Sequence, residues 1–179
     1  IAAFARREHA KVMRAEPRPS SFGRFVDGRE GATEESVRRF GVIEYHYQRL
    51  GEVVQFALET LFALSPVLSG DYRRAHTLFV GGVAVSNLKT WRPESGEEVY
   101  IANPLPYARK IELGKMTMRL PGSSRVYAQA EQIVRRRFGN VAAIKFTFLA
   151  VADGRGGQGR AGAALERDAR RPALSIRAY

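Results

Sequence analysis

Apolar residues recur at helical spacing along several stretches of this chain. The clearest set comprises Leu50, Val53, Val54, Ala57, Leu58, Leu61 and Phe62, with polar residues on the opposite face. This helix is expected to end near Leu64, because Pro66 disfavours helical geometry at Ser65. A second helix is predicted from Ser123 or Ser124 to Phe138, and a weaker apolar face predicts a short helix within residues 1–15.

Alternation of apolar and polar residues predicts the strands. Ile43, Tyr45 and Tyr47 alternate with Glu44 and His46, which places the aromatic rings on one strand face. Further strands are expected at residues 76–86 (a hairpin or a bulged strand around Gly81 and Gly82), 98–102 and 141–151. The pattern indicates the α+β class: a small, mostly antiparallel sheet packed against one long and one or two shorter helices, with extended N- and C-terminal arms.

Changes in composition along the chain suggest three parts. Residues 1–36 are expected to form an N-terminal helix and an arm, because prolines and glycines interrupt regular structure after residue 15. Residues 37–152 are expected to form the core domain. Residues 153–179 are expected to form a flexible tail, since five of the nine residues from Gly154 to Gly162 are glycine.

The segment from Asn103 to Gly114 predicts a short helix with defined ends. Asparagine is favoured as an N-cap and proline in the first helical turn, which suits Asn103 and Pro104. Gly114 suits the C′ position, where many helices end in the left-handed region. A substitution of Gly114 by valine should therefore destabilise the fold.

The net charge of +11 favours contact with phosphates or with another acidic surface. Basic residues are spread along the chain, with one tight cluster at Arg135, Arg136 and Arg137. These three arginines are candidates for lining a DNA channel, although the dipole of the predicted helix also favours positive charge in its last turn. Cysteine is absent, and no apolar run is long enough to span a bilayer, so we expect no membrane contact and synthesis in the cytoplasm.

The sequence offers little for catalysis, and we expect no catalytic, cofactor-binding or metal-binding residues. Gly154, Gly156 and Gly159 satisfy G-x-G-x-x-G, but too few residues follow for the second half of a βαβ unit. The histidines His9, His46 and His76 are far apart and lack metal-ligand spacing. There is no G-x-S-x-G elbow for a serine nucleophile. The prediction is a protein that is not an enzyme.

Two spaced segments stand out from the rest of the chain. The first follows the long helix and contains Ser65, Pro66, Ser69, Gly70, Tyr72 and Arg73. The second contains Asn103, Pro106, Tyr107, Ala108, Arg109, Glu112 and Gly114. Their order, over residues 37–151, resembles the neck and tail-completion proteins of siphovirus-type bacteriophages and gene transfer agents. In that family a Ser-Pro-Val-x-(Ser/Thr)-Gly junction precedes an Asn-x-x-Pro-Tyr-Ala-(Arg)-x-x-Glu-x-Gly signature.

The resemblance implies a structural virion protein, synthesised and assembled in the bacterial host cytoplasm. It would form a homo-oligomeric ring, expected to be hexameric, at the phage neck or the head-proximal end of the tail. Its partners would be the head connector or stopper and the tail-tube or tail-terminator proteins. Packaged DNA would pass through the lumen and touch it without sequence preference.

Two questions stay open at the level of sequence. The charge also fits a basic nucleic-acid-binding protein without enzymatic activity, which is the alternative function. Tyr107 and Glu112 are either subunit-interface residues or intrachain packing residues, and Glu112 has a possible partner in Arg109, three residues earlier.

Overall fold

The computed structural model confirms the α+β class and describes residues 1–15, 19, 21–94, 96–150 and 170–179. The chain forms two compact units, Ile1–Glu52 and Val53–Tyr179, each of which is described by itself. Within the described residues no helix is long and apolar enough to cross a membrane.

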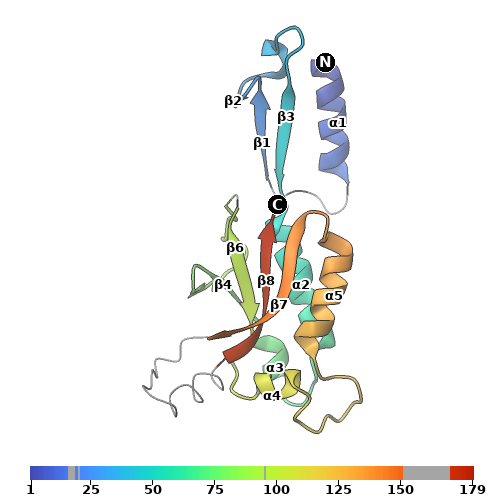
Figure 1. The fold of residues 1–179 in the computed structure, drawn as a ribbon, viewed down its shortest axis with the longest axis vertical. Helices are drawn as coiled ribbons and strands as arrows, with labels where there is room; N and C mark the ends of the chain where they lie inside the picture. Colours follow the sequence, from blue (N-terminus) through green and yellow to red (C-terminus); the bar gives the residue numbers. More distant parts are fainter. Residues whose placement is uncertain (16–18, 20, 95, 151–169) are drawn as a thin grey trace. The chain divides into compact units, whose positions relative to one another are not determined.

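The first unit is a three-stranded antiparallel sheet with one helix along it (Figure 1). Its elements in chain order are α1 (Ala2–Arg14), β1 (Ser21–Val26), β2 (Arg29–Glu30), the 3₁₀ turn η1 (Glu34–Ser36) and β3 (Ile43–Gln48). The predicted N-terminal helix is confirmed. The arm that we expected within residues 1–36 instead contains the β1–β2 hairpin, and β1 also pairs with β3 over six residues, from Ser21↔Gln48 to Val26↔Ile43. Strand β3 therefore belongs to this unit and not to the expected core domain.

The second unit is a five-stranded antiparallel sheet in the order β5-β4-β6-β8-β7. Its elements are α2 (Leu50–Leu64, beginning at the unit boundary), α3 (Asp71–Arg74), β4 (Thr77–Val80), β5 (Val83–Ala84), β6 (Glu98–Ala102), α4 (Ala108–Glu112), α5 (Val126–Phe138), β7 (Ala142–Ala150) and β8 (Arg170–Ala178). The predicted helices at residues 50–64 and 126–138 are both confirmed.

Helices α2 and α5 lie side by side against one face of this sheet (Figure 1). Their contact includes an edge-to-face pair between Phe56 and Phe138, with ring centroids 5.5 Å apart. Between helix and sheet the side chains of Val126, Val134, Ile101, Leu174 and Ile176 are completely or almost completely buried. Helices α3 and α4 are short, and they lie together at one end of the sheet.

The flexible tail that we expected over residues 153–179 is wrong for residues 170–178. These residues form β8, which lies between β6 and β7 and is paired to both. That expectation was based on the glycine run of residues 154–162, and Pro172 is itself unusual in a central strand. The proline is tolerated because β6 pairs with β8 only as far as Ala102↔Ala173, so Pro172 lies one position beyond that ladder. The remainder of the expected tail, residues 153–169, lies outside the described residues.

Leu174→Ala should lower the free energy of unfolding by about 2–5 kcal/mol. Leu174 is fully buried, so truncation of its side chain leaves a cavity between the central strand and the helices. Urea unfolding followed by circular dichroism measures the change. Arg177→Ala, on the exposed part of the same strand, is the matched control and should change stability by less than about 0.5 kcal/mol. Equal stability of Leu174→Ala and the control would contradict the placement of β8.

Candidate functional site

The two segments singled out in the sequence meet at the end of the second unit that carries α3 and α4. The contact is direct: the Asn103 amide Nδ2 donates a hydrogen bond of 2.9 Å to the Tyr72 carbonyl oxygen. The rings of Tyr72 and Tyr107 also lie 6.3 Å apart, centroid to centroid. Segments separated by about thirty residues in sequence therefore form one local structure, with a buried polar junction inside it and an apolar groove on its surface.

Asn103 is part of the polar junction and not the helix N-cap that we expected. Helix α4 begins at Ala108, and its N-cap position is occupied by Tyr107 without a side-chain capping bond. The Asn103 side chain is completely buried, and its Oδ1 accepts a hydrogen bond of 3.1 Å from the Leu105 backbone N–H. The side chain thus turns the chain after β6 and ties it to α3.

His76 is the second member of the junction. Its Nε2 lies 2.7 Å from the Ser65 hydroxyl, and its Nδ1 lies 2.8 Å from the Tyr127 hydroxyl. Because the Ser65 hydroxyl donates its proton to the Leu61 carbonyl, Nε2 must donate to Ser65 and Nδ1 must accept from Tyr127. A neutral imidazole satisfies every one of these bonds, and burial lowers the pKa of His76 to about 4.

The contact between Ser65 and His76 is structural in its chemistry. The serine hydroxyl is buried and uses its proton on a helix carbonyl, so the imidazole does not activate it as a base would. Its effect is to join the end of α2 to β4 and α5. Neither His76 nor Tyr127 was recognised as a site residue from the sequence, because nothing in their local sequence context marks a pairing across 51 residues.

Glu112 caps the start of a different helix. Its two carboxylate oxygens accept hydrogen bonds from the backbone N–H groups of Tyr127 (2.9 Å) and Ala128 (3.0 Å), in the first turn of α5. The N-cap residue of α5, Arg125, has a left-handed φ of 56° and supplies no side-chain cap. Burial raises the pKa of Glu112 above 4.5, and the two N–H donors oppose that rise. The possible Glu112–Arg109 pair is not among the ion pairs of the described residues; the guanidinium of Arg109 instead lies over the Phe148 ring, 4.5 Å from its centroid.

Gly114 ends α4 as the sequence predicts. It follows the C-cap Leu113 and has a φ of 67°. The Gly114 N–H donates to the Ile111 carbonyl (3.1 Å), and the Lys115 N–H donates to the Lys110 carbonyl (2.8 Å), which together make a Schellman motif. The chain then leaves the helix and forms the loop of residues 115–125.

The groove lies between this loop and the loop that follows α2. It encloses about 580 Å³ and is lined by Pro66, Val67, Leu68, Ser69, Gly70, Asp71, Tyr72, Tyr107, Ile111, Met116, Thr117, Met118, Arg119, Leu120 and Ser123. Apolar side chains at its margin face solvent: Leu68 is 92% exposed and Leu120 is 69% exposed. Aliphatic groups presented in this way on two facing loops are typical of a surface that binds another molecule.

The other residues of the two segments have local structural contacts. Gly70 has a φ of 85° at the start of α3, and the Ser69 hydroxyl donates to Asp71 (2.6 Å), which also pairs with Arg74 (2.9 Å). The guanidinium of Arg73 lies over the Phe62 ring at 4.5 Å from its centroid. Of the remaining predicted residues, Pro66 lines the groove, Pro106 is exposed and Ala108 is buried.

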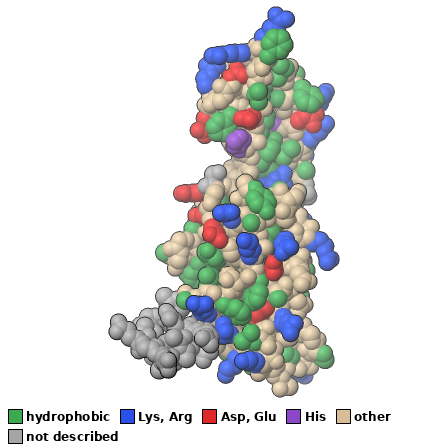
Figure 2. Space-filling view, in the orientation of Figure 1, with side chains coloured by type: hydrophobic (Ala, Val, Ile, Leu, Met, Phe, Trp, Pro, Cys, Tyr) green, Lys and Arg blue, Asp and Glu red, His purple; other side chains and the backbone are tan. Residues whose placement is uncertain are grey.

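The three arginines proposed for a DNA channel are not equivalent. Arg135 pairs with Glu131 (3.0 Å), and Arg137 lies over the Phe56 ring at 4.5 Å, so both have local partners. Arg136 is exposed and has neither kind of contact with the described residues. On the face of the second unit seen in Figure 2, Lys and Arg side chains are scattered among apolar and neutral ones instead of forming one stripe.

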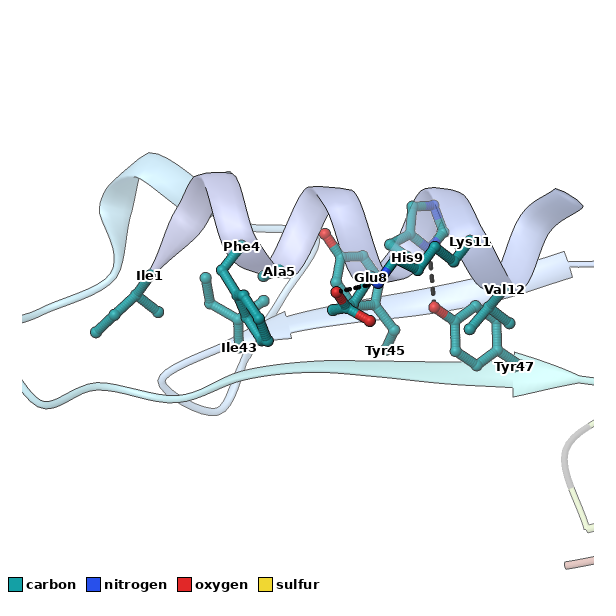
Figure 3. A pocket seen from close by; sticks show the side chains of 10 residues that line it. All are labelled: Ile1, Phe4, Ala5, Glu8, His9, Lys11, Val12, Ile43, Tyr45 and Tyr47. Atoms are coloured by element: carbon teal, nitrogen blue, oxygen red, sulfur yellow. Dashed lines mark hydrogen bonds and ion pairs between the residues drawn. The ribbon is translucent and has the colours of Figure 1, made fainter.

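The first unit holds a second hollow, between α1 and β3 (Figure 3). Its volume is about 430 Å³. The His9 ring stacks on Tyr45 at 4.3 Å between centroids, and His9 Nδ1 is hydrogen-bonded to the Tyr47 hydroxyl at 3.0 Å. No residue of α1 is fully buried, so the helix covers the sheet without filling the space beneath it.

A partly buried ion pair stabilises the face of that sheet on which α1 lies. The Tyr45 hydroxyl donates to Glu34 (2.6 Å) and the Arg24 guanidinium lies 3.1 Å from the same carboxylate. The hydrogen bond from Tyr45, reinforced by Arg24, lowers the pKa of Glu34 to about 2. The alternation of aromatic residues predicted the strand, but it gave no indication of this contact.

Within the part of the chain that the structure describes, no group of three or more histidine, aspartate or glutamate side chains could hold a metal ion. No protein-family model, curated protein or solved structure matches this chain. Any function therefore has to be argued from its own residues.

Gly114→Val should lower the free energy of unfolding by at least about 1–2 kcal/mol, because a side chain with a Cβ disfavours the left-handed region. A Cβ at this position would meet no atom within 4 Å, so the cost comes from the backbone alone. Gly114→Asn should cost less, since asparagine tolerates this conformation. Thermal unfolding of both variants, with exposed Lys110→Ala as the control, tests the ranking. An unchanged melting temperature for Gly114→Val would contradict it.

Protonation of His76 should destabilise the fold as the pH falls from about 6.5 towards 4. Its pKa is lower in the folded state than the ordinary 6.5, so the unfolded chain binds the extra proton first. The loss should approach about 1.4 kcal/mol per pH unit within this range. Urea unfolding at a series of pH values should show a steeper decline for the wild type than for His76→Gln. Parallel declines would show that His76 does not titrate in this way.

Proposed function

We propose that this chain is a structural subunit of a phage-type virion, which assembles into a ring at the neck or the head-proximal end of the tail. The ring would join the head connector to the tail tube and surround the DNA channel. The observation that carries the proposal is the meeting of the two sequence segments through Asn103 and Tyr72. Those segments are the basis of the resemblance, and the fold makes them a single site.

The local geometry supports a binding role for that site. The polar junction uses buried side chains to position two loops, and the tips of these loops carry exposed aliphatic groups instead of catalytic ones. Tyr107 contributes to the groove wall, whereas Glu112 is used inside the chain. Glu112 therefore packs within the chain, and half-buried Tyr107 in the groove wall is the residue that we propose for contact with a partner.

The first unit also presents an apolar group to solvent. Phe40 is 87% exposed and has a left-handed φ of 67°, an unfavourable conformation for an aromatic residue. The Asp27 carboxylate holds the surrounding loop by accepting hydrogen bonds from the backbone N–H groups of Arg38 (3.0 Å) and Val42 (2.9 Å). A strained loop that exposes a large apolar side chain is consistent with a second assembly contact.

The net charge of +11 is compatible with a ring around DNA, which would attract phosphates without reading bases. The same charge opposes self-association of isolated chains, because like charges repel. We therefore expect the ring to form on its assembly partners and not in a solution of the chain alone.

Coexpression of the chain with phage connector and tail-tube proteins should give complexes that contain it in an annular layer. Electron microscopy of the purified complexes, with mass measurement, tests this prediction. A chain that stays monomeric and joins no complex under these conditions would contradict the proposal.

Duplex binding separates the ring from the alternative of a nucleic-acid-binding protein. Fluorescence anisotropy with a short DNA duplex, over a range of salt concentrations, should show weak binding by the isolated chain. Tight binding with a steep dependence on salt, together with failure to join particles, would favour the alternative.

A further inference from the structure

The groove of the second unit has mainly apolar walls, and the one basic residue that lines it is Arg119. The two segments that form its walls, residues 66–74 and 107–123, contain six basic residues and two acidic ones: Arg73, Arg74, Arg109, Lys110, Lys115 and Arg119 against Asp71 and Glu112. The composition of the walls is therefore unbalanced in favour of positive charge.

Glu112 does not offset this charge at the surface, and Asp71 offsets only the charge of Arg74. Glu112 is 4% exposed and its oxygens accept the N–H groups of α5. Asp71 is engaged by Arg74 and by the Ser69 hydroxyl, which lower the pKa of its carboxyl group and keep it ionised within that local set. Lys110, Lys115 and Arg119 are exposed, and they form no ion pair with the described residues.

Apolar walls beside a basic residue favour some ligands of the groove over others. A second copy of the chain would bring its net charge of +11 to a chain of the same charge, and to a groove whose basic lining residue Arg119 needs an acidic partner, which is unfavourable. A nucleic acid would satisfy the cations, but its phosphates would gain nothing from Val67, Leu68 or Leu120. A peptide that carries both acidic and apolar side chains satisfies both parts of the groove.

We infer that the groove binds a short acidic segment of a partner protein, one in which leucine or aromatic side chains alternate with aspartate or glutamate. The apolar side chains of the segment enter between the loop of Val67 and Leu68 and the loop of Met116 to Leu120. Its carboxylates lie against Arg119 and against Lys115, the exposed residue that precedes Met116 in the groove wall. The inference rests on the proposed function, because it names the kind of partner that an assembly subunit of this charge would recruit.

The test begins with a random twelve-residue peptide display library selected on the immobilised full chain. Selected peptides should be enriched in Asp and Glu beside Leu, Phe or Trp. Synthetic fluorescent copies of these peptides are then titrated with the wild type, with Leu68→Ser and with Arg119→Glu. Each substitution changes an exposed side chain, so both variants should fold. We expect about tenfold weaker binding for each variant, since such contacts dominate small interfaces.

Val83→Ser is the matched control, because Val83 is an exposed apolar residue of the same unit on β5, outside the groove lining. It should bind the peptides as the wild type does. Selected peptides without acidic residues, or equal binding by the wild type and both groove variants, would overturn the inference. A short DNA duplex that displaces the peptides and itself binds less well to Leu68→Ser would also overturn it, by making the groove a nucleic-acid site.

The outcomes are separable from those of the ring experiment. A chain that joins an annular layer but selects no acidic peptide keeps the proposed function and loses this inference. A chain that binds acidic peptides through Leu68 and Arg119 but joins no ring keeps the groove and loses the virion assignment.

Discussion

The end of the second unit depends on one buried carboxylate placed at the start of a helix. The first turn of α5 has backbone N–H groups with no partner inside the helix, and its N-cap residue Arg125 supplies none. Glu112 reaches from α4 and accepts two of them. Hydrogen bonds to a charged acceptor contribute about 1.5–3 kcal/mol each, and a buried N–H left alone is a comparable loss. The short helix α4 is thereby joined to the long helix α5.

The groove follows from this constraint and from the rest of the polar junction. The loop of residues 115–125 starts at the left-handed Gly114 and ends at the left-handed Arg125, with Glu112 holding the helices at its two ends. The facing loop after α2 is placed by Ser65 and by the Asn103 contact to Tyr72. Hydrogen bonds in a dry interior are strong and directional, so a few such anchors position both loops. Apolar tips such as Leu68 then remain exposed instead of collapsing onto the body of the protein.

The hydrophobic pattern was sufficient to predict the long helices, several strands and the α+β class, because those features follow from local periodicity. It also predicted the left-handed cap at Gly114. It could not predict β8, since Pro172 and a glycine run preceded a short apolar segment, and central strands show no clear alternation. The pairing of β1 with β3 was likewise hidden by glycines. The hydrogen bonds that join Asn103 to Tyr72, His76 to Ser65 and Tyr127, and Glu112 to Tyr127 span 11 to 51 residues, so no local pattern reports them.

The central position of β8 has a consequence for biosynthesis. Strand β8 pairs with both β6 and β7. It is synthesised about seventy residues after β6, and also after β7. Until β8 emerges, the nascent chain holds two open strand edges, which is a condition that favours aggregation and delays folding. The five-stranded sheet of the second unit can therefore be completed only after β8 has been synthesised.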